Sequence, residues 1–188
     1  MTPDVQDLMA NDAARDDELI LVDALDRQVG TATKWQTHEK GLLHRVFSVV
    51  LTRDGDDGPE LLLAKRALCK YHSGGLWANS CCSHPRTGEE VVEAAYRRVR
   101  EELGCTAVGL RRIAAFVYRA EFDNGLCEFE YDHVLVGRFE GEFALDPCEA
   151  SEVRWTGFDA LSDELIAEPQ KFAAWVPMVL SMAMADAR

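Results

Sequence analysis

The segment from Thr87 to Gly104 carries the strongest secondary-structure signal in this chain. Its apolar residues recur with the spacing of one helix face, at Val91, Val92, Ala94, Ala95, Val99 and Leu103. Thr87 precedes Glu90 by three positions, which is the pattern of a capping box, and Gly104 is a typical residue just beyond a helix end. The sequence therefore predicts one amphipathic helix in the middle of the chain, with Thr87 as its N-cap.

Strand patterns flank this helix on both sides. Apolar and β-branched runs predict strands at 18–23, 44–52, 60–66, 114–122, 126–139 and 152–158. A loop opens at Gly74 and runs to Pro85, and helical patterns close the chain at 160–166 and 172–185. Strands, a central helix, more strands and a terminal helix predict a mixed α/β (α+β) fold.

The length and charge of the chain limit its setting and its partners. Its 188 residues suit a single domain, which we take as 18–188, and the acidic stretch 1–17 is expected to be a flexible lead. The sequence has neither the pattern of a signal peptide nor an apolar run of about 18 residues, so we expect a cytoplasmic protein without a membrane partner. The net charge of −13 argues against a nucleic-acid partner but is compatible with a local basic pocket for a small phosphate.

The cysteine content fits a reducing compartment. The six cysteines occupy positions 69, 81, 82, 105, 127 and 148. In the cytoplasm most of them are expected to be buried, inert and unpaired. Adjacent cysteines such as Cys81 and Cys82 rarely bond to each other, because the geometry is poor.

Two short patterns place reactive side chains on shared faces. If the cysteine-containing loop before the helix is extended, Cys82 and His84 point to one side and Cys81 to the other. In the predicted strand 126–139, Glu128 and Glu130 share one face. Two such carboxylates repel each other unless water, a cation or a proton lies between them.

Histidines elsewhere complete a set of possible metal ligands. Imidazole mixed with carboxylate is the ligand chemistry of zinc, manganese or iron, whereas magnesium prefers carboxylate and phosphate oxygens. The predicted ligands are His38, His44, His84, Glu128 and Glu130. The alternative is that the histidines are structural or face solvent and that the glutamates are solvated; we interpret His72 and His133 in this way. None of the common short zinc spacings is present.

Charged residues on the predicted helix allow two interpretations. Arg97 and Arg98 lie about one turn from Glu101 and Glu102, which indicates ion pairs on a solvated face. The alternative is a face that binds magnesium and a diphosphate. In that case the basic residues around the phosphates would be Lys34, Arg66, Lys70 and Arg98.

These motifs together resemble a known family. The run from Ser83 through Glu89 to Cys105 resembles a degenerate Nudix box, with Ser83 in place of the first glycine and Arg98 in place of a glutamate. The sequence Asn-Ser-Cys-Cys-Ser-His-Pro, the spacing Lys34-x3-His38-x5-His44-Arg with Phe-Ser after it, and Glu-x-Glu at 128–130 are similar to type 1 isopentenyl diphosphate isomerases. The resemblance covers nearly the whole chain, from about residue 19 to about residue 175.

The resemblance implies a Nudix-like mixed sheet sandwiched by helices and assigns roles to particular residues. Cys82, Glu130 and Tyr118 would be catalytic, with Tyr118 assisting Glu130. The metal ligands would be His38, His44, His84, Glu128 and Glu130, and Glu102 would help to hold a magnesium ion bound to the diphosphate. The substrate contacts would be Lys34, Arg66, Lys70 and Arg98 to the diphosphate and Trp175 near the prenyl carbons.

The implied reaction is the isomerisation of isopentenyl diphosphate to dimethylallyl diphosphate, a step of isoprenoid synthesis. It protonates one carbon and deprotonates another through a carbocation-like intermediate, and Cys82 and Glu130 are suited to these two transfers. An indole face at Trp175 would stabilise the cation, and apolar walls would keep water away from it. The expected cofactors are one manganese, zinc or iron ion and a magnesium ion that arrives with the substrate.

Two other functions fit parts of the sequence. A Nudix hydrolase of a nucleoside diphosphate derivative would need the acidic residues of the box, and Arg98 replaces one of them. A non-catalytic zinc-binding module would explain the histidines but not Cys82. No dinucleotide fingerprint is present, so no flavin is expected. The partner is expected to be a small prenyl diphosphate, and the protein a monomer or weak homodimer.

Overall fold

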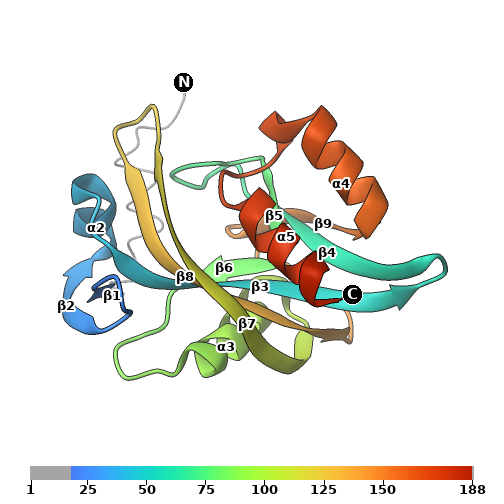
Figure 1. Ribbon diagram of the computed structural model, residues 1–188, viewed down its shortest axis with the longest axis horizontal. Coiled ribbons are helices and arrows are strands. Elements are labelled where there is room, and N and C mark those ends of the chain that lie inside the picture. The colour runs from blue at the N-terminus through green and yellow to red at the C-terminus, as the bar shows by residue number, and fades with distance from the viewer. Residues whose placement is uncertain (1–17, 188) are drawn as a thin grey trace.

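A computed structural model of the chain describes residues 18–187 (Figure 1). The strands are β1 (Glu18–Val22), β2 (Gln28–Thr33), β3 (His44–Gly55), β4 (Gly58–Arg66), β5 (Trp77–Asn79), β6 (Cys81–Ser83), β7 (Thr106–Glu121), β8 (Cys127–Glu140) and β9 (Ala150–Gly157). The helices are α2 (Lys34–Lys40), α3 (Val91–Leu103), α4 (Phe158–Ala167), the short 3-10 helix η1 (Pro169–Lys171) and α5 (Val176–Asp186). The predicted lead at residues 1–17 lies outside the described residues.

Strand β3 is the centre of the sheet. It runs parallel to β8 along one edge, from the pair His44–Glu130 to the pair Thr52–Arg138. Along its other edge it pairs in an antiparallel manner with β1, then β6, then β4. Strand β4 in turn pairs with β5 and β9, and β8 pairs with β7. His44, at the start of β3, therefore lies between β1 and β8, and residues 47–49 lie between β6 and β8.

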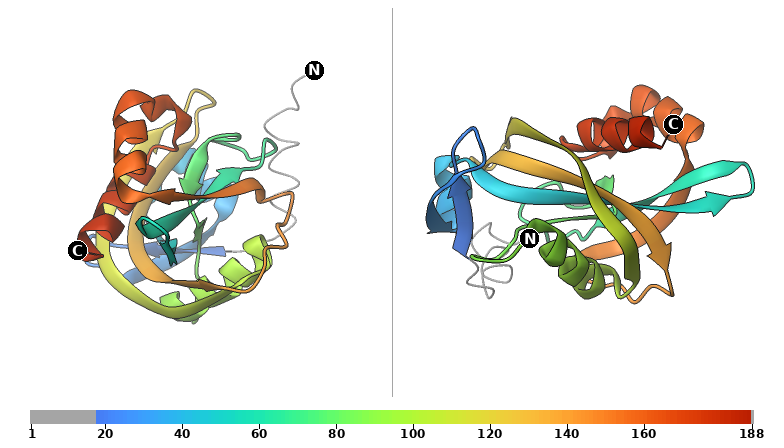
Figure 2. Two further views of the ribbon diagram at one scale, coloured as in Figure 1. Left: turned by 90° about the vertical axis from the view of Figure 1, so that its right-hand side faces the viewer. Right: turned by 60° about the horizontal axis from the view of Figure 1, so that its bottom comes forward.

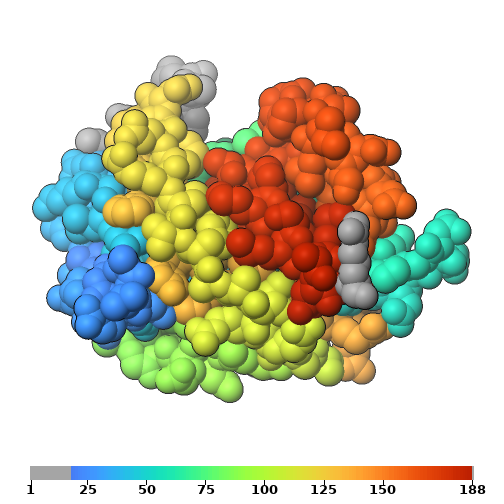
Figure 3. Space-filling model, viewed as in Figure 1, coloured from blue at the N-terminus to red at the C-terminus, as the bar shows by residue number. Residues whose placement is uncertain are grey.

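Helices cover both faces of this mixed sheet (Figure 2). Helix α3 packs on one face through buried residues that include Val99 and Leu103. Helix α5 packs on the other face through Val176, Val179 and Leu180, and α4 lies beside it. The space-filling view shows α5 lying against β7 (Figure 3). The expected mixed sheet between helices is thus confirmed.

The central helix differs from its prediction at one end only. It ends as expected at Gly104, whose backbone has a φ of 66° and whose N–H donates to the carbonyl of Arg100. A side chain at Gly104 would also collide with the backbone of Ala144, because a Cβ would lie 2.5 Å from its carbonyl oxygen. The predicted Thr87 cap is wrong, because residues 86–89 form a separate turn and the helix begins after Glu90.

Other differences concern short elements. Helix α2 was not predicted; the Thr33 side chain caps it by accepting from the N–H of Gln36, and it ends at Gly41. The predicted loop 74–85 contains the two short strands β5 and β6, which extend the sheet beside β4 and β3. Strand β7 begins at Thr106, well before the predicted residue 114. Among residues 18–187, no helix has the length and apolar character needed to cross a bilayer.

Candidate active site

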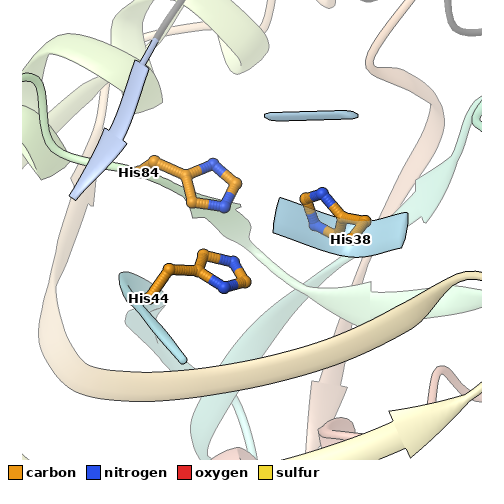
Figure 4. Close-up of side chains that lie close together, drawn as sticks. All are labelled: His38, His44 and His84. Atoms are coloured by element: carbon orange, nitrogen blue, oxygen red, sulfur yellow. The ribbon is translucent and has the colours of Figure 1, made fainter. Parts of the chain in front are cut away.

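Three histidines from different elements meet at one end of the sheet (Figure 4). His38 comes from α2, His44 begins β3, and His84 follows β6. Each offers a ring nitrogen, and these nitrogens all lie within 4.8 Å of one another. The three side chains predicted from the sequence as imidazole ligands are therefore brought together by the fold.

Backbone carbonyls orient two of these rings. His38 donates from Nδ1 to the carbonyl oxygen of Lys34 at 2.6 Å, and His44 donates from Nδ1 to that of Leu42 at 2.9 Å. A carbonyl oxygen only accepts, so Nδ1 carries the proton in each ring and Nε2 keeps its lone pair. Metal-binding histidines are commonly held in this way.

The two predicted glutamates lie beside the histidines. The parallel pairing of β3 with β8 places Glu130 next to His44, and their Oε1 and Nε2 atoms are 3.8 Å apart. An Oε2 atom of Glu128 lies 3.4 Å from Nε2 of His38. His44, Glu128 and Glu130 also offer ligand atoms that lie within 4.8 Å of one another. All five predicted metal ligands thus belong to one cluster.

The charge states of three of these ligands, His44, His84 and Glu128, suit a cation. Burial lowers the pKa of His44 to about 4, with help from neighbouring His38, and burial also lowers the pKa of His84 well below its usual range. Burial disfavours ionisation of Glu128, but His38 and His72 together hold the pKa of that carboxyl well below its ordinary value. Neutral imidazoles and an ionised carboxylate are the forms that bind a divalent metal.

Unsatisfied atoms in this cluster provide a second test of that fit. The Nε2 atoms of His44 and His84 and the Oε2 atom of Glu128 are buried without a hydrogen-bond partner. Buried polar atoms are rarely left unpaired in proteins, and each one that is needs an explanation. A divalent metal coordinated by these atoms supplies that explanation, so the residues fit the ion.

The two other histidines are buried as well, and they differ from each other. His72 contacts Glu128 through its Nε2 and lines the cavity beside the cluster. The sequence did not predict this contact, and we interpreted His72 as structural or solvent-facing. His72 lies in an irregular loop, which has no local pattern that would reveal the contact. His133 points to the other face of β8, where Asp26 and Arg112 lie next to its ring.

A cavity next to the metal cluster contains the predicted catalytic residues. Cys82, Tyr118, Glu130 and Trp175 all line it. Cys81, in contrast, is buried in the core under α3. The two cysteines therefore point to opposite sides, as the extended backbone predicted.

Hydrogen bonds hold the thiol of Cys82 in this cavity. Its Sγ donates to Oδ1 of Asn79 at 3.0 Å, and the hydroxyl of Ser48 lies 3.4 Å from it. The same Ser48 hydroxyl donates to the buried carboxylate of Asp132 at 2.8 Å. Burial, together with the charge of Asp132, raises the pKa of Cys82 to about 12, so this thiol is protonated at neutral pH.

Tyr118 and Glu130 are direct neighbours on adjacent strands. They form a register pair between β7 and β8, and both side chains line the cavity. Burial raises the pKa of Glu130 well above its usual range, and Glu128 adds to this effect. The pair can therefore hold a proton inside the cavity, facing the same space as the Cys82 thiol.

The four predicted phosphate-contacting residues line a second cavity that adjoins the first. These residues are Lys34, Arg66, Lys70 and Arg98. Arg66 lines both cavities, and its guanidinium lies over the ring of Trp175 at 5.2 Å. We call this second space the cationic cavity.

Carboxylates cross-link part of the cationic cavity. Arg98 donates to Glu102 at 2.7 Å, to Glu149 at 2.9 Å and to Glu101 at 2.8 Å, so the predicted ion pairs on the helix are present. Lys70 also pairs with Glu149. Arg98 and Glu102 are nearly inaccessible to solvent, so this lattice is not on a solvated face as the simpler interpretation expected.

Sequence reasoning assigned no role to several residues around these cavities. Asn79 and Ser48 hold the Cys82 thiol, and Asp132 holds Ser48. Asp132 follows Glu128 and Glu130 in the alternation of β8, so its position could have been found from that pattern. Glu149 lies in an irregular connection before β9 and gives no local signal.

Comparison with known proteins defines the class first. The family model of the NUDIX domain matches residues 42–176, so the chain belongs to the Nudix family. Solved structures agree on the fold. The protein DR0079 from Deinococcus radiodurans has a TM-score of 0.68 at 19% identity and covers 87% of this chain and 97% of its own. A MutT NUDIX hydrolase from Burkholderia pseudomallei has a TM-score of 0.59 at 22% identity and covers 74% of this chain and 97% of its own.

Closer relatives define the particular family. An isopentenyl-diphosphate Delta-isomerase of Serratia proteamaculans is 46% identical over 85% of this chain and 87% of its own length. Another, of Burkholderia multivorans, is 45% identical over 89% of this chain and 93% of its own length. Within the Nudix family, the chain therefore belongs to the isopentenyl-diphosphate Delta-isomerases.

Proposed function

We propose that this enzyme converts isopentenyl diphosphate to dimethylallyl diphosphate, with the prenyl group in the cavity of Cys82 and the diphosphate in the cationic cavity. One observation carries the proposal: the cavity with the proton-transfer residues adjoins the cavity with four basic side chains, and Arg66 lines both. A substrate with an alkene at one end and a diphosphate at the other matches that division. The names of the relatives support the same reaction.

Cys82 and Glu130 are the proposed proton-transfer groups. They lie on β6 and β8, which flank β3 on opposite edges, so they approach the shared cavity from different sides. Moving a double bond along three carbons requires one group to give a proton and another to take one. Tyr118, the neighbour of Glu130 across the β7–β8 pair, assists that carboxyl. Exchange of these protons with solvent resets the pair after each turnover.

Trp175 is the proposed stabiliser of positive charge on the prenyl carbons. Trp175 is 4% exposed and lines the same cavity as Cys82. An aromatic face stabilises a desolvated cation by about 2 kcal/mol. The buried walls also exclude water, which would otherwise trap a tertiary cation as an alcohol.

Lys34, Arg66, Lys70 and Arg98 are the proposed diphosphate ligands, and Glu102 the proposed carboxylate for a magnesium ion that arrives with the substrate. Glu102 lines a neighbouring cavity that shares Arg66 and Lys70 with the cationic cavity, and it accepts from Arg98. Cationic side chains and magnesium neutralise a diphosphate, and this anchors the substrate while the prenyl end reacts.

The cluster of His38, His44, His84, Glu128 and Glu130 is the proposed site of one manganese, zinc or iron ion. A mixed set of imidazole and carboxylate donors suits each of these metals. When bound, such an ion withdraws electron density from its carboxylate ligands and so tunes the acidity of Glu130. We also infer a cytoplasmic monomer or weak homodimer without a membrane partner. The net charge of −13 supports the absence of a nucleic-acid partner.

The deciding experiment is incubation of the metal-replete protein with isopentenyl diphosphate and magnesium in deuterated water, followed by NMR of the products. We expect dimethylallyl diphosphate that carries deuterium, and none of it with Cys82→Ala. The matched control is Cys81→Ala, which removes a neighbouring thiol on the opposite side of the strand and is expected to keep turnover.

Other outcomes would support the other functions. Release of phosphate without an isomer would support a Nudix hydrolase, although the engagement of Glu101 and Glu102 by Arg98 argues against one. Metal binding without either product would support a non-catalytic zinc-binding module.

A further inference from the structure

Two exposed cysteines lie next to each other at the edge of the cationic cavity. Cys69 and Cys148 are 79 positions apart in the sequence, yet Sγ of Cys69 lies 3.8 Å from the carbonyl oxygen of Cys148. All six cysteines lie within the described residues, and these two alone among them are exposed. The expectation that most cysteines of this chain are buried therefore does not extend to this pair.

The backbone places both cysteines at equivalent positions of two adjoining turns. The N–H of Lys70 donates to the carbonyl of Ala67 at 3.2 Å, and the N–H of Glu149 donates to that of Asp146 at 2.9 Å. Each cysteine is the third residue of its turn. The turns are joined directly, because the N–H of Ala67 donates to the carbonyl of Glu149 at 3.0 Å.

The residue that follows each cysteine belongs to the ion-pair lattice of the cationic cavity. Lys70 follows Cys69, Glu149 follows Cys148, and these two side chains contact each other. Glu149 also accepts from Arg98 at 2.9 Å. The two thiols are thus one residue away from a proposed diphosphate ligand and its carboxylate partner.

We propose that Cys69 and Cys148 are a modification site: they form a reversible disulfide that fastens the two turns together and weakens diphosphate binding in the cationic cavity. A disulfide requires the two Cβ atoms to come within about 3.5–4.5 Å of each other. The two residues are already in contact, because Sγ of Cys69 lies 3.8 Å from the carbonyl oxygen of Cys148. Both thiols are accessible to an oxidant, and both lie in turns outside the regular strands, where the backbone can adjust with little loss of sheet pairing.

The oxidant is a small-molecule disulfide, and the reaction is thiol–disulfide exchange. The thiolate of one cysteine attacks the oxidant, its S–S bond breaks, and one small thiol leaves. The second cysteine then attacks the mixed disulfide and releases the other small thiol. The protein loses two electrons and two protons, and one molecule of oxidant becomes two thiols.

The effect on binding, which rests on the proposed function, follows from the positions of Lys70 and Glu149. A disulfide between Cys69 and Cys148 fixes the two turns relative to each other. It therefore maintains the ion pair between Lys70 and Glu149. The ammonium group is then less available to a diphosphate. Loss of one charge-assisted contact corresponds to about a tenfold rise in KM for isopentenyl diphosphate, with kcat nearly unchanged.

The test begins with the full-length protein and oxidised glutathione, followed by alkylation, digestion without reductant and mass spectrometry. We expect a peptide pair that joins Cys69 to Cys148, lacks two hydrogens and separates after treatment with dithiothreitol. Cys69→Ser and Cys148→Ser each abolish it, whereas the control Cys127→Ser, at a buried thiol, leaves it in place. Recovery of Cys69 and Cys148 as separately alkylated peptides after excess oxidant would overturn the proposal.

Steady-state kinetics of the oxidised and the reduced protein test the second part of the proposal, that the disulfide weakens diphosphate binding. A cross-linked protein whose KM equals that of the reduced protein would overturn the coupling to the cationic cavity. So would the same rise in KM in oxidised Cys69→Ser, since the effect would then come from another thiol. The peptide mapping needs no activity, so an inactive protein would count against the proposed function while the disulfide is still decided.

Discussion

Cys82 and Trp175 are joined through a single oxygen atom. Oδ1 of Asn79 accepts from the Cys82 thiol at 3.0 Å and from the indole Nε1 of Trp175 at 3.1 Å. The amide nitrogen of Asn79 donates to the backbone carbonyls of Val49 and Cys81, both at 3.0 Å, so the orientation of the amide is fixed. A proposed proton-transfer group and the proposed aromatic wall therefore keep a constant position relative to each other.

The aromatic face of Trp175 is expected to matter more than its N–H. Trp175→Ala removes a stabilisation of about 2 kcal/mol and should lower kcat roughly 30-fold, whereas Trp175→Phe keeps a ring and should lose much less. The measurement is kcat with isopentenyl diphosphate at a temperature where both variants are folded by circular dichroism. Equal losses in the two variants would contradict the role of the ring.

His72 is expected to support metal binding through Glu128. Its Nε2 contacts that carboxylate, and loss of such a partner typically weakens metal affinity 10–100-fold. We expect this weakening for His72→Gln, measured by competition with a chelator and elemental analysis. His133→Gln is the matched control, because His133 is also buried but faces the other side of β8. Equal metal affinity in the two variants would show that the contact is unimportant.

Arg98 is expected to contribute to both stability and substrate binding. Arg98→Met leaves the buried carboxylate of Glu102 without its cation and removes one of the two cations that contact Glu149. Breaking a buried ion pair in this way costs about 3–5 kcal/mol. We expect a clear fall in Tm and a higher KM. Arg111→Met, which removes an exposed pair with Asp186, should change Tm little. Equal shifts in Tm would contradict the importance of burial here.

The pair of Glu89 and Arg97 is expected to give an acid-dependent part of the stability. Hydrogen bonds from Arg97 lower the pKa of Glu89 from 4.5. Because the folded-state value is the lower one, the stabilisation is fully present above about pH 4.5 and disappears as the pH falls through the folded-state pKa. Glu89→Gln should therefore lower Tm by a few degrees at pH 7 and by progressively less as the pH falls below about 4.5. Thermal denaturation of both proteins across this range is the measurement, and a difference independent of pH would rule out this cause.

Local periodicity explains what the sequence predicted well. The core of α3, the long strand β3 and the shared face of Glu128 and Glu130 all depend on repeats of 3.6 or two residues. The short helix α2, which carries His38, could not be predicted from the sequence, because seven residues are too few for a clear helical pattern.

Contacts made by irregular segments explain what the sequence did not predict. His72 meets Glu128 of β8 from a loop, and Lys70 meets Glu149 between two loops. The course of these loops is set by the sheet and not by their own residues. The Thr87 cap failed for a related reason: Glu89 bonds to the N–H of Arg86 and to Arg97, which stabilises a separate turn where a capping box would have started the helix.

The order of the site residues along the chain matters during synthesis on the ribosome. The five proposed metal ligands lie between His38 and Glu130, while Trp175 is made only afterwards, at the start of α5. Because synthesis runs from the N-terminus, a nascent chain has the complete ligand set before it has the wall that closes the prenyl cavity. The metal centre can form early, and the chamber for the substrate is finished only when α5 docks on the sheet.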